Sequence, residues 1–289
     1  MKDFISDFKK LVKLRLTFLV VFSASVSFLI GSREQGEINW INWLILTIGG
    51  FLVTGSANGF NEIIEKDLDK LMQRTSDRPI PSGRMTTGQA LVLSILMGIL
   101  GTLILVRLNF LTGVLSVFSI FLYAILYTPL KRKSPIAVFV GAFPGALPPL
   151  IGYFAAFNEP RISWIPIILF LIQFVWQFPH FWGIAWVLDD DYKKAGFRLL
   201  PTTKRDRISA LFTLASTIIL VPVSLLPTIM GFGGYIIGVV SLIAGVVFCW
   251  QAWKLYRNLD IVSARKVMFG SFFYLPLVQL VLLFDFIAK

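Results

Sequence analysis

Three oxygen-bearing side chains recur at four-residue intervals in the first quarter of the chain. Asn61, Glu65 and Asp69 fall on one face if this segment is helical. Hard cations such as Mg²⁺ prefer carboxylate and amide oxygens together with substrate phosphate, and Asp67 offers a further carboxylate around the helix. The pattern predicts a magnesium site formed by Asn61, Glu65, Asp67 and Asp69. The alternative is a solvated helix end whose charge is balanced by neighbouring lysines.

Two arginines follow these acids. Arg74 and Arg78 stand shortly after Asp69, and guanidinium groups make bidentate contacts with phosphate oxygens. Acids that hold magnesium beside arginines that hold phosphate indicate a diphosphate site. Membrane topology alone would also place arginines here, so their predicted role depends on the neighbouring acids.

A second acidic cluster begins another polar segment. Asp189, Asp190 and Asp191 follow directly on a long apolar run. Together with the first cluster they could hold two magnesium ions, and a plain solvated helix end is the alternative. Lys131 and Arg132 end a different apolar run and would lie near any diphosphate, although basic residues also serve as ordinary interfacial anchors.

Polar side chains also interrupt a long apolar run. Gln173, Gln177 and His180 are spaced by four and three residues, and His180 is the single histidine of the chain. Polar groups inside a bilayer are costly and tend to be functional, and imidazole is a common axial partner of haem iron. Neighbouring aromatic residues, Trp182 among them, could line a flat macrocycle. The alternative is a hydrogen-bonded structural histidine with ordinary aromatic packing.

The elements that position these residues are membrane spans. The chain is 56% hydrophobic and 15% charged, against about 25% charged in soluble domains. Apolar runs of about 20 residues suit a hydrocarbon layer roughly 30 Å thick. We predict an all-α fold with nine transmembrane helices, at residues 16–31, 43–60, 89–108, 110–127, 136–157, 164–187, 210–230, 234–253 and 268–287.

The basic residues fix the expected topology. Of the 27 Lys and Arg, 23 lie in the N-terminal stretch and in alternate loops, whereas Arg33, Arg107, Arg161 and Lys289 lie on the other side. Positive residues mark cytoplasmic loops, so we expect a cytoplasmic N-terminus and an external C-terminus. This separation requires an odd number of spans. It also explains the net charge of +11 without nucleic acid.

No composition shift divides the chain. We expect one transmembrane domain, residues 1–289, with long cytoplasmic loops at about 61–87 and 189–209. Because Cys249 is the single cysteine, disulfides and covalent haem attachment through a pair of cysteines are excluded. A helical solute transporter is a rival interpretation, but the acids cluster at one face of the membrane and the sequence shows no internal repeat.

Asn61-x3-Glu65-x3-Asp69 with the following Met72-x-Arg74-Thr75-x2-Arg78-Pro79 resembles the first acidic motif of the UbiA-type intramembrane prenyltransferases. Within that superfamily the chain is similar to the protohaem IX farnesyltransferases. Three stretches carry this narrower resemblance: Tyr127-Thr128 to Lys131-Arg132 with Gly141 to Gly152 after it, His180-Phe181-Trp182, and Asp191-Tyr192-Lys193-x-Ala195-Gly196 to Leu200-Pro201.

The resemblance implies a nine-helix bundle in the plasma (inner) membrane that transfers farnesyl from farnesyl diphosphate to a vinyl group of haem B. Addition of water would complete haem O for terminal oxidases, with haem A synthase or an oxidase assembly as partners. It also implies Mg²⁺ on Asn61, Glu65, Asp69 and Asp191, diphosphate on Arg74, Arg78, Lys131, Arg132 and Lys193, and haem beside His180, Gln177 and Trp182.

The sequence departs from the superfamily pattern at the second acidic motif. Quinone-forming members carry Asp-x3-Asp there, whereas Lys193 and Lys194 stand four residues after Asp189 and Asp190. Glu65 also replaces the usual Asp. The difference at the second motif favours the haem branch and leaves open which of Asp189, Asp190 and Asp191 binds metal. A prenyltransferase acting on an aromatic quinone precursor is the alternative.

Overall fold

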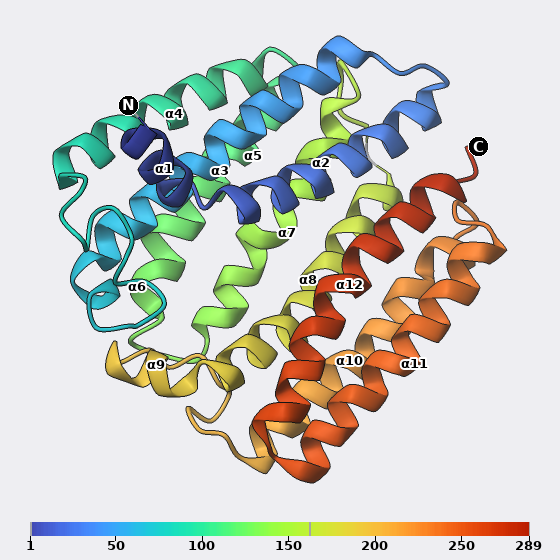
Figure 1. Cartoon of the computed structure of the whole chain (residues 1–289). Coiled ribbons are helices and arrows are strands. Elements are labelled where there is room, and N and C mark those ends of the chain that lie inside the picture. The colour runs from blue at the N-terminus through green and yellow to red at the C-terminus, as the bar shows by residue number, and fades with distance from the viewer. Residues whose placement is uncertain (1, 162, 289) are drawn as a thin grey trace.

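The structure is a computed structural model that describes residues 2–161 and 163–288, so Lys289, assigned above to the external side, lies outside the described residues. Within this part of the chain, nine helices are long and apolar enough to cross a membrane, which confirms the predicted all-α fold (Figure 1). They are α2 (Leu14–Gln35), α3 (Trp40–Asp69), α4 (Thr87–Val106), α5 (Phe110–Phe121) with its continuation, α7 (Ala137–Ala155), α8 (Trp164–Val187), α10 (Arg207–Ile229), α11 (Tyr235–Asn258) and α12 (Ile261–Phe284).

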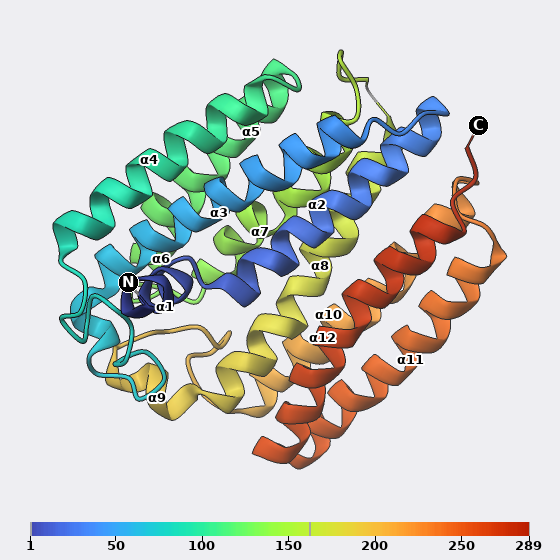
Figure 2. The same cartoon turned by 45° about the horizontal axis from the view of Figure 1, so that its top comes forward.

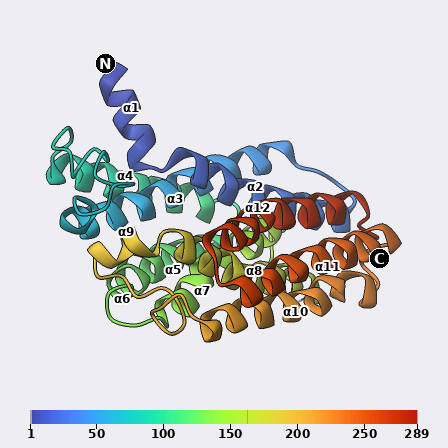
Figure 3. The same ribbon diagram turned by 60° about the horizontal axis from the view of Figure 1, so that its bottom comes forward.

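Three shorter helical pieces lie at the ends of the spans. They are α1 (Lys2–Leu11), α6 (Thr128–Leu130) and α9 (Asp189–Lys194). A π-helical turn, η1 (Leu122–Tyr127), joins α5 to α6, so the fourth span runs on without a break as far as Leu130. Figure 3 shows α1 projecting from the bundle on the side of α4.

Local sequence signals define several helix starts. Asn39 caps α3 by accepting hydrogen bonds from two backbone N–H groups, and Thr86 forms a reciprocal capping box with Gln89 at the start of α4. Asp206 and Asp260 cap α10 and α12 through single backbone N–H groups. These caps satisfy donors that a helix leaves unpaired at its N-terminus.

Span α7 is helical despite Pro144, Pro148 and Pro149. Prolines are tolerated in membrane helices when neighbouring helices pack around them, and α7 packs against α2 and α8. The approach to α2 is close at Gly152, because a Cβ atom there would lie 1.9 Å from the Ala24 carbonyl oxygen. Glycine, which has no Cβ atom, is therefore required at this helix contact.

The helices form two groups. Figure 2 shows α2 to α7 on one side and α10 to α12 on the other, with α8 between them. A buried polar contact joins the first and last spans, since Gln279 Nε2 lies 2.8 Å from Ser23 Oγ and 2.9 Å from Gln173 Oε1. One end of the bundle carries residues 70–86, 131–136 and 188–206 (Figure 1). We refer to it as the loop end.

Candidate functional site

The predicted acidic stripe lies on the last two turns of α3. Asn61, Glu65 and Asp69 are 1%, 3% and 0% exposed. Each contacts a cation from a different segment: Lys13 Nζ is 2.5 Å from Asn61 Oδ1, Lys131 Nζ is 2.7 Å from Glu65 Oε1, and Arg78 Nη1 is 2.5 Å from Asp69 Oδ2. The structure therefore brings acids and bases together at one buried site, as a site for diphosphate requires.

The charges at this site are only partly satisfied. Asp69 Oδ1 is buried without a hydrogen-bond partner. Burial lowers the pKa of Lys13 well below its ordinary value, and the neighbouring cations Arg78 and Lys131 lower it further. Lys13 was not singled out from the sequence, where it is one of several lysines in a basic stretch. Its contact with Asn61 depends on how α1 and α2 pack against α3.

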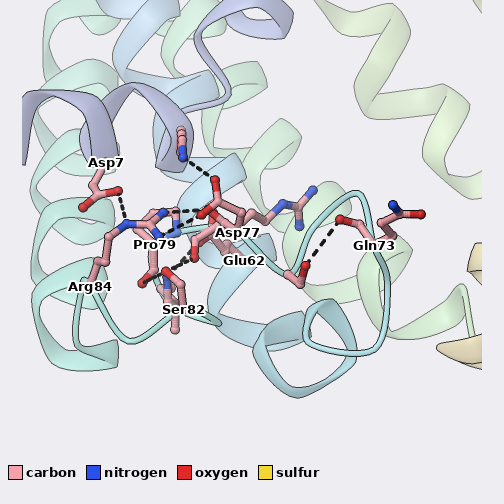
Figure 4. Close-up of polar contacts among 11 residues, drawn as sticks. Asp7, Glu62, Gln73, Asp77, Pro79, Ser82 and Arg84 are labelled. Atoms are coloured by element: carbon pink, nitrogen blue, oxygen red, sulfur yellow. Dashed lines mark hydrogen bonds and ion pairs between the residues drawn. The ribbon is translucent and has the colours of Figure 1, made fainter. Parts of the chain in front are cut away.

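Residues 70–86 carry the predicted phosphate-binding arginines, and we refer to them as the arginine loop. This loop is held against α3. Glu62 is fully buried, and its Oε1 accepts a hydrogen bond from the backbone N–H of Ile80 at 3.2 Å. Its other oxygen, Oε2, is buried without a partner. Figure 4 draws Glu62 together with these loop residues. Sequence reasoning missed Glu62, although its position three residues before Glu65 and seven before Asp69 continues the stripe.

The outer part of this loop is tied to α1. Arg84 Nε is 2.8 Å from Asp7 Oδ1, and Arg84 Nη1 is 2.9 Å from Asp77 Oδ1 (Figure 4). Lys10 Nζ lies 2.6 Å from Asp77 Oδ2. The N-terminal helix thus fixes one side of the arginine loop, while Glu62 fixes the other.

Of the three aspartates on α9, only Asp191 is placed against the arginine loop. Its two oxygens accept hydrogen bonds from the backbone N–H groups of Gln73, at 3.0 Å, and Arg74, at 3.3 Å. Burial raises the pKa of Asp191, but these hydrogen bonds and Lys194 outweigh burial and hold the pKa below its ordinary value. Asp191 is therefore an anion that anchors the loop.

The other two aspartates form ion pairs outside this contact. Asp189 Oδ2 lies 2.6 Å from Lys193 Nζ. Asp190 Oδ2 lies 3.0 Å from Arg205 Nη1 and is exposed. The three acids therefore differ in their contacts: Asp191 binds the arginine loop, whereas Asp189 and Asp190 pair with Lys193 and Arg205.

The π-helical turn η1 positions the basic end of the fourth span. Thr128 Oγ1 lies 3.1 Å from Asn61 Nδ2, and the Lys131 ammonium lies 4.8 Å from the centre of the Tyr127 ring. Turns of this kind inside α-helices are frequent at functional sites. A hollow of about 450 Å³ opens next to the stripe, lined by Ile64, Glu65, Leu68, Thr128, Pro129, Arg132 and Lys133.

The structure does not bring Asp67 into the stripe. Its side chain is 73% exposed, and Oδ1 lies 3.2 Å from Lys70 Nζ. Across residues 2–161 and 163–288, no three His, Cys, Asp or Glu side chains form a metal-ligand cluster by themselves. A cation at this site would depend on amide and phosphate oxygens as well as on carboxylates.

The polar stripe predicted on α8 divides between two neighbouring helices. Gln177 Nε2 donates to the Ala142 carbonyl on α7 at 2.9 Å. His180 instead faces α12, with Nδ1 2.8 Å from Ser271 Oγ. Its ring stacks on Trp176 at 4.4 Å between centres and meets Phe272 edge-on. His180 therefore lies in an aromatic setting between α8 and α12.

Trp182 lies farther along α8 and packs towards α10. Its ring centre is 5.5 Å from that of Phe178 and 6.0 Å from that of Phe212. Its Nε1 is buried without a hydrogen-bond partner. The three residues predicted to contact haem therefore face three different helices: Gln177 faces α7, His180 faces α12 and Trp182 faces α10.

The chain is similar in sequence to known proteins along most of its length. A sequence model of the UbiA prenyltransferase family matches residues 20–276. The protoheme IX farnesyltransferase of Cytophaga hutchinsonii is 46% identical over 278 residues, which cover 96% of both chains. That of Flavobacterium psychrophilum is 44% identical and covers 98% of this chain and 95% of its own.

Solved structures share the fold. A digeranylgeranylglyceryl phosphate synthase superposes with a TM-score of 0.81 over 99% of both chains at 20% identity. A UbiA homologue from Archaeoglobus fulgidus, bound to DMAPP and Mg²⁺, superposes with a TM-score of 0.71 over 96% of this chain and 99% of its own, at 12% identity.

Proposed function

The chain belongs to the UbiA prenyltransferase family, and we propose that it transfers the farnesyl group of farnesyl diphosphate to a vinyl group of haem B, with addition of water, to make haem O. The curated relatives described above are protoheme IX farnesyltransferases that match almost the whole chain. The structural observation that carries the proposal is the buried stripe of Asn61, Glu65 and Asp69 beside the arginine loop.

The protein is a multi-pass membrane protein. We propose that residues 1–289 form one domain in the plasma membrane, with the N-terminus and the loop end in the cytoplasm. The concentration of basic residues in the loops of that end supports this orientation. The farnesyl tail and haem B would dissolve in the bilayer, while the diphosphate stays at its aqueous edge.

The residues at the stripe fit a Mg²⁺ ion. Asn61, Glu65 and Asp69 supply hard oxygen ligands, and the buried, unpartnered Oδ1 of Asp69 is available to a cation. We propose these three as ligands, with Asp191 at a second position, and leave out Asp67 because it faces solvent. When bound, Mg²⁺ supplies positive charge that stabilises the departing diphosphate.

Five basic residues are proposed to hold the diphosphate: Arg74, Arg78, Lys131, Arg132 and Lys193. Arg78 and Lys131 already lie at the stripe, and Arg132 lines the adjacent hollow. Lys13 belongs to the same cluster of cations. Stabilisation of charge that develops on a leaving group is usually the largest catalytic contribution.

The reaction needs no nucleophile from the protein. Cleavage of the C1–O bond of farnesyl diphosphate leaves the electron pair on the diphosphate and gives an allylic cation. The vinyl group of haem B forms the new carbon–carbon bond to C1, and the positive charge moves to the carbon next to the macrocycle. Water adds there and loses a proton, which leaves a hydroxyl group.

We propose that haem B lies beside α8. His180 would orient it, through the iron or through a hydrogen bond, and Trp182 would supply aromatic surface. Gln177 would contribute by holding α7 against α8, because its amide donates to the Ala142 carbonyl. Haem A synthase or an oxidase assembly would take up the product.

A substrate panel tests this proposal. Purified protein with labelled farnesyl diphosphate and Mg²⁺ should label haem B and leave 4-hydroxybenzoate unlabelled. Labelling of the hydroxybenzoate alone would refute the haem assignment and leave the family assignment intact. Movement of substrate across the membrane of proteoliposomes without any covalent change would favour a transporter and refute the proposed transfer reaction.

A further inference from the structure

The turn from α11 to α12 lies at the loop end (Figure 1). A second hollow opens at this turn, and its lining shares no residue with the stripe or the arginine loop. Its volume is about 300 Å³. It is lined by Trp253, Lys254, Arg257, Asn258, Asp260, Val262, Ser263 and Lys266. Three cations and one carboxylate thus surround a space on the surface of the bundle.

Several basic residues of the loop end form ion pairs, but the three cations of this hollow form none within the described residues. Pairs elsewhere at this end are Lys10–Asp77, Arg78–Asp69, Arg84–Asp7, Lys131–Glu65, Lys193–Asp189 and Arg205–Asp190. Within the described chain, none of Lys254, Arg257 and Lys266 lies within 4.0 Å of a carboxylate oxygen. Asp260, whose Oδ1 caps α12 through Ser263 N at 2.6 Å, offsets only one of the three positive charges and interacts with Lys266. The hollow therefore attracts anions.

Two tryptophans identify which anion suits the site. Trp250 and Trp253 are 54% and 37% exposed and stack with 4.9 Å between ring centres. The Lys254 ammonium lies 5.1 Å from the Trp250 ring, and the Arg257 guanidinium lies 5.4 Å from the Trp253 ring. Exposed tryptophan on a membrane helix marks the level of the lipid headgroups, so the cations lie where lipid phosphates lie.

We propose that this hollow binds the phosphate of an anionic phospholipid, with the acyl chains against the exposed apolar side of α11. Val246 and Val247, one turn from Trp250, form part of that side and are exposed. Basic pockets between transmembrane helices on the cytoplasmic side recognise anionic headgroups in this way. The net charge of +2 near the headgroup, at about 1 kcal/mol per charge, gives a preference for anionic over zwitterionic lipid of roughly 30-fold.

Native mass spectrometry of the delipidated full-length protein in neutral detergent tests the proposal. The ligands are phosphatidylglycerol, phosphatidylcholine and the soluble glycerol 3-phosphate. Lys254→Ala/Lys266→Ala removes two cations from the hollow, and Lys254→Arg/Lys266→Arg keeps the charge. Lys70→Ala/Lys204→Ala is the matched control, because it removes two exposed lysines from other parts of the loop end.

The proposal predicts that phosphatidylglycerol binds with a defined stoichiometry and that the alanine pair weakens binding roughly 30-fold. The arginine pair and the Lys70/Lys204 control should bind within about threefold of the unaltered protein. Equal weakening in both alanine pairs would overturn the site in favour of general surface attraction. Glycerol 3-phosphate binding as tightly as phosphatidylglycerol would overturn the choice of a lipid.

Discussion

The substitution Asp69→Asn removes one negative charge from the acidic stripe and leaves the size of the side chain nearly unchanged. The Asp69 side chain is 0% exposed, and its partner Arg78 is 16% exposed. Removing one member of a buried ion pair costs about 3–5 kcal/mol. Asn retains an acceptor for the Arg78 guanidinium and water reaches part of Arg78, so we expect a smaller loss of about 2 kcal/mol. That loss leaves a protein of ordinary stability folded.

The expected effect on catalysis is larger than the effect on stability. Loss of one preorganised group that stabilises developing charge costs roughly 100- to 1,000-fold in turnover. Single-turnover formation of farnesylated haem, followed by chromatography, measures this loss, and thermal unfolding in detergent measures stability. The two measurements together show whether lost activity comes from the site or from unfolding.

Asp67→Asn is the matched control on the same helix. Asp67 is 73% exposed and pairs with Lys70 at 3.2 Å, and exposed pairs of this kind contribute about 0–1 kcal/mol. Its turnover should stay within about twofold of the unaltered protein. The reasoning is refuted if folded Asp69→Asn protein keeps more than about a third of its turnover, or if Asp67→Asn loses as much as Asp69→Asn.

Three further outcomes are expected. Glu62→Ala should raise the KM for farnesyl diphosphate roughly tenfold with the KM for haem unchanged, because the buried acceptor that holds Ile80 N is lost; Glu62→Gln should restore it, and failure to do so would count against a positioning role. His180→Ala should weaken haem B binding and change the haem absorption spectrum on titration, and an unchanged spectrum would rule out axial ligation. Burial raises the pKa of Asp206, but hydrogen bonds from Ser209 and Thr202 hold it below its ordinary value. The Asp206 cap should therefore stabilise α10 by about 1 kcal/mol at neutral pH and lose this effect only as the pH falls below about 4. The unaltered protein should therefore melt at a higher temperature than Asp206→Ala at neutral pH, and this difference should be lost as the pH falls below about 4. A difference that persists at pH 2 would contradict the role of the Asp206 charge.

The spans and the acidic stripe were predictable because they depend on local spacing. Apolar runs of membrane length locate the helices, and the four-residue spacing of Asn61, Glu65 and Asp69 requires only that α3 continue beyond its apolar part, as it does. Glu62 follows the same rule. The sequence therefore contained the signal for it, three residues ahead of Glu65.

The pairings of Asn61 and Glu65 were not predictable, because their partners come from distant segments, whereas Arg78, the partner of Asp69, lies nine residues away and was predicted at the site. Lys13 and Lys131 reach Asn61 and Glu65 across 48 and 66 residues, and the choice of Asp191 among three adjacent acids depends on how α9 packs against the arginine loop.

The residues of the predicted polar stripe on α8 face different neighbouring helices because of their angular spacing around the helix. Gln177 and His180 point about 60° apart around the helix, at about 100° per residue. Because α8 has neighbours on several sides, including α7 and α12, this angle is enough to aim the two side chains at different helices.

Mass spectrometry of the haem recovered after incubation of the purified protein with haem B, farnesyl diphosphate and Mg²⁺ tests the proposed function most directly. We expect a haem heavier by one farnesyl group and one hydroxyl group, with the hydroxyl oxygen coming from labelled water. Recovery of unchanged haem B under conditions where the same protein cleaves farnesyl diphosphate would contradict the assignment of haem as the acceptor.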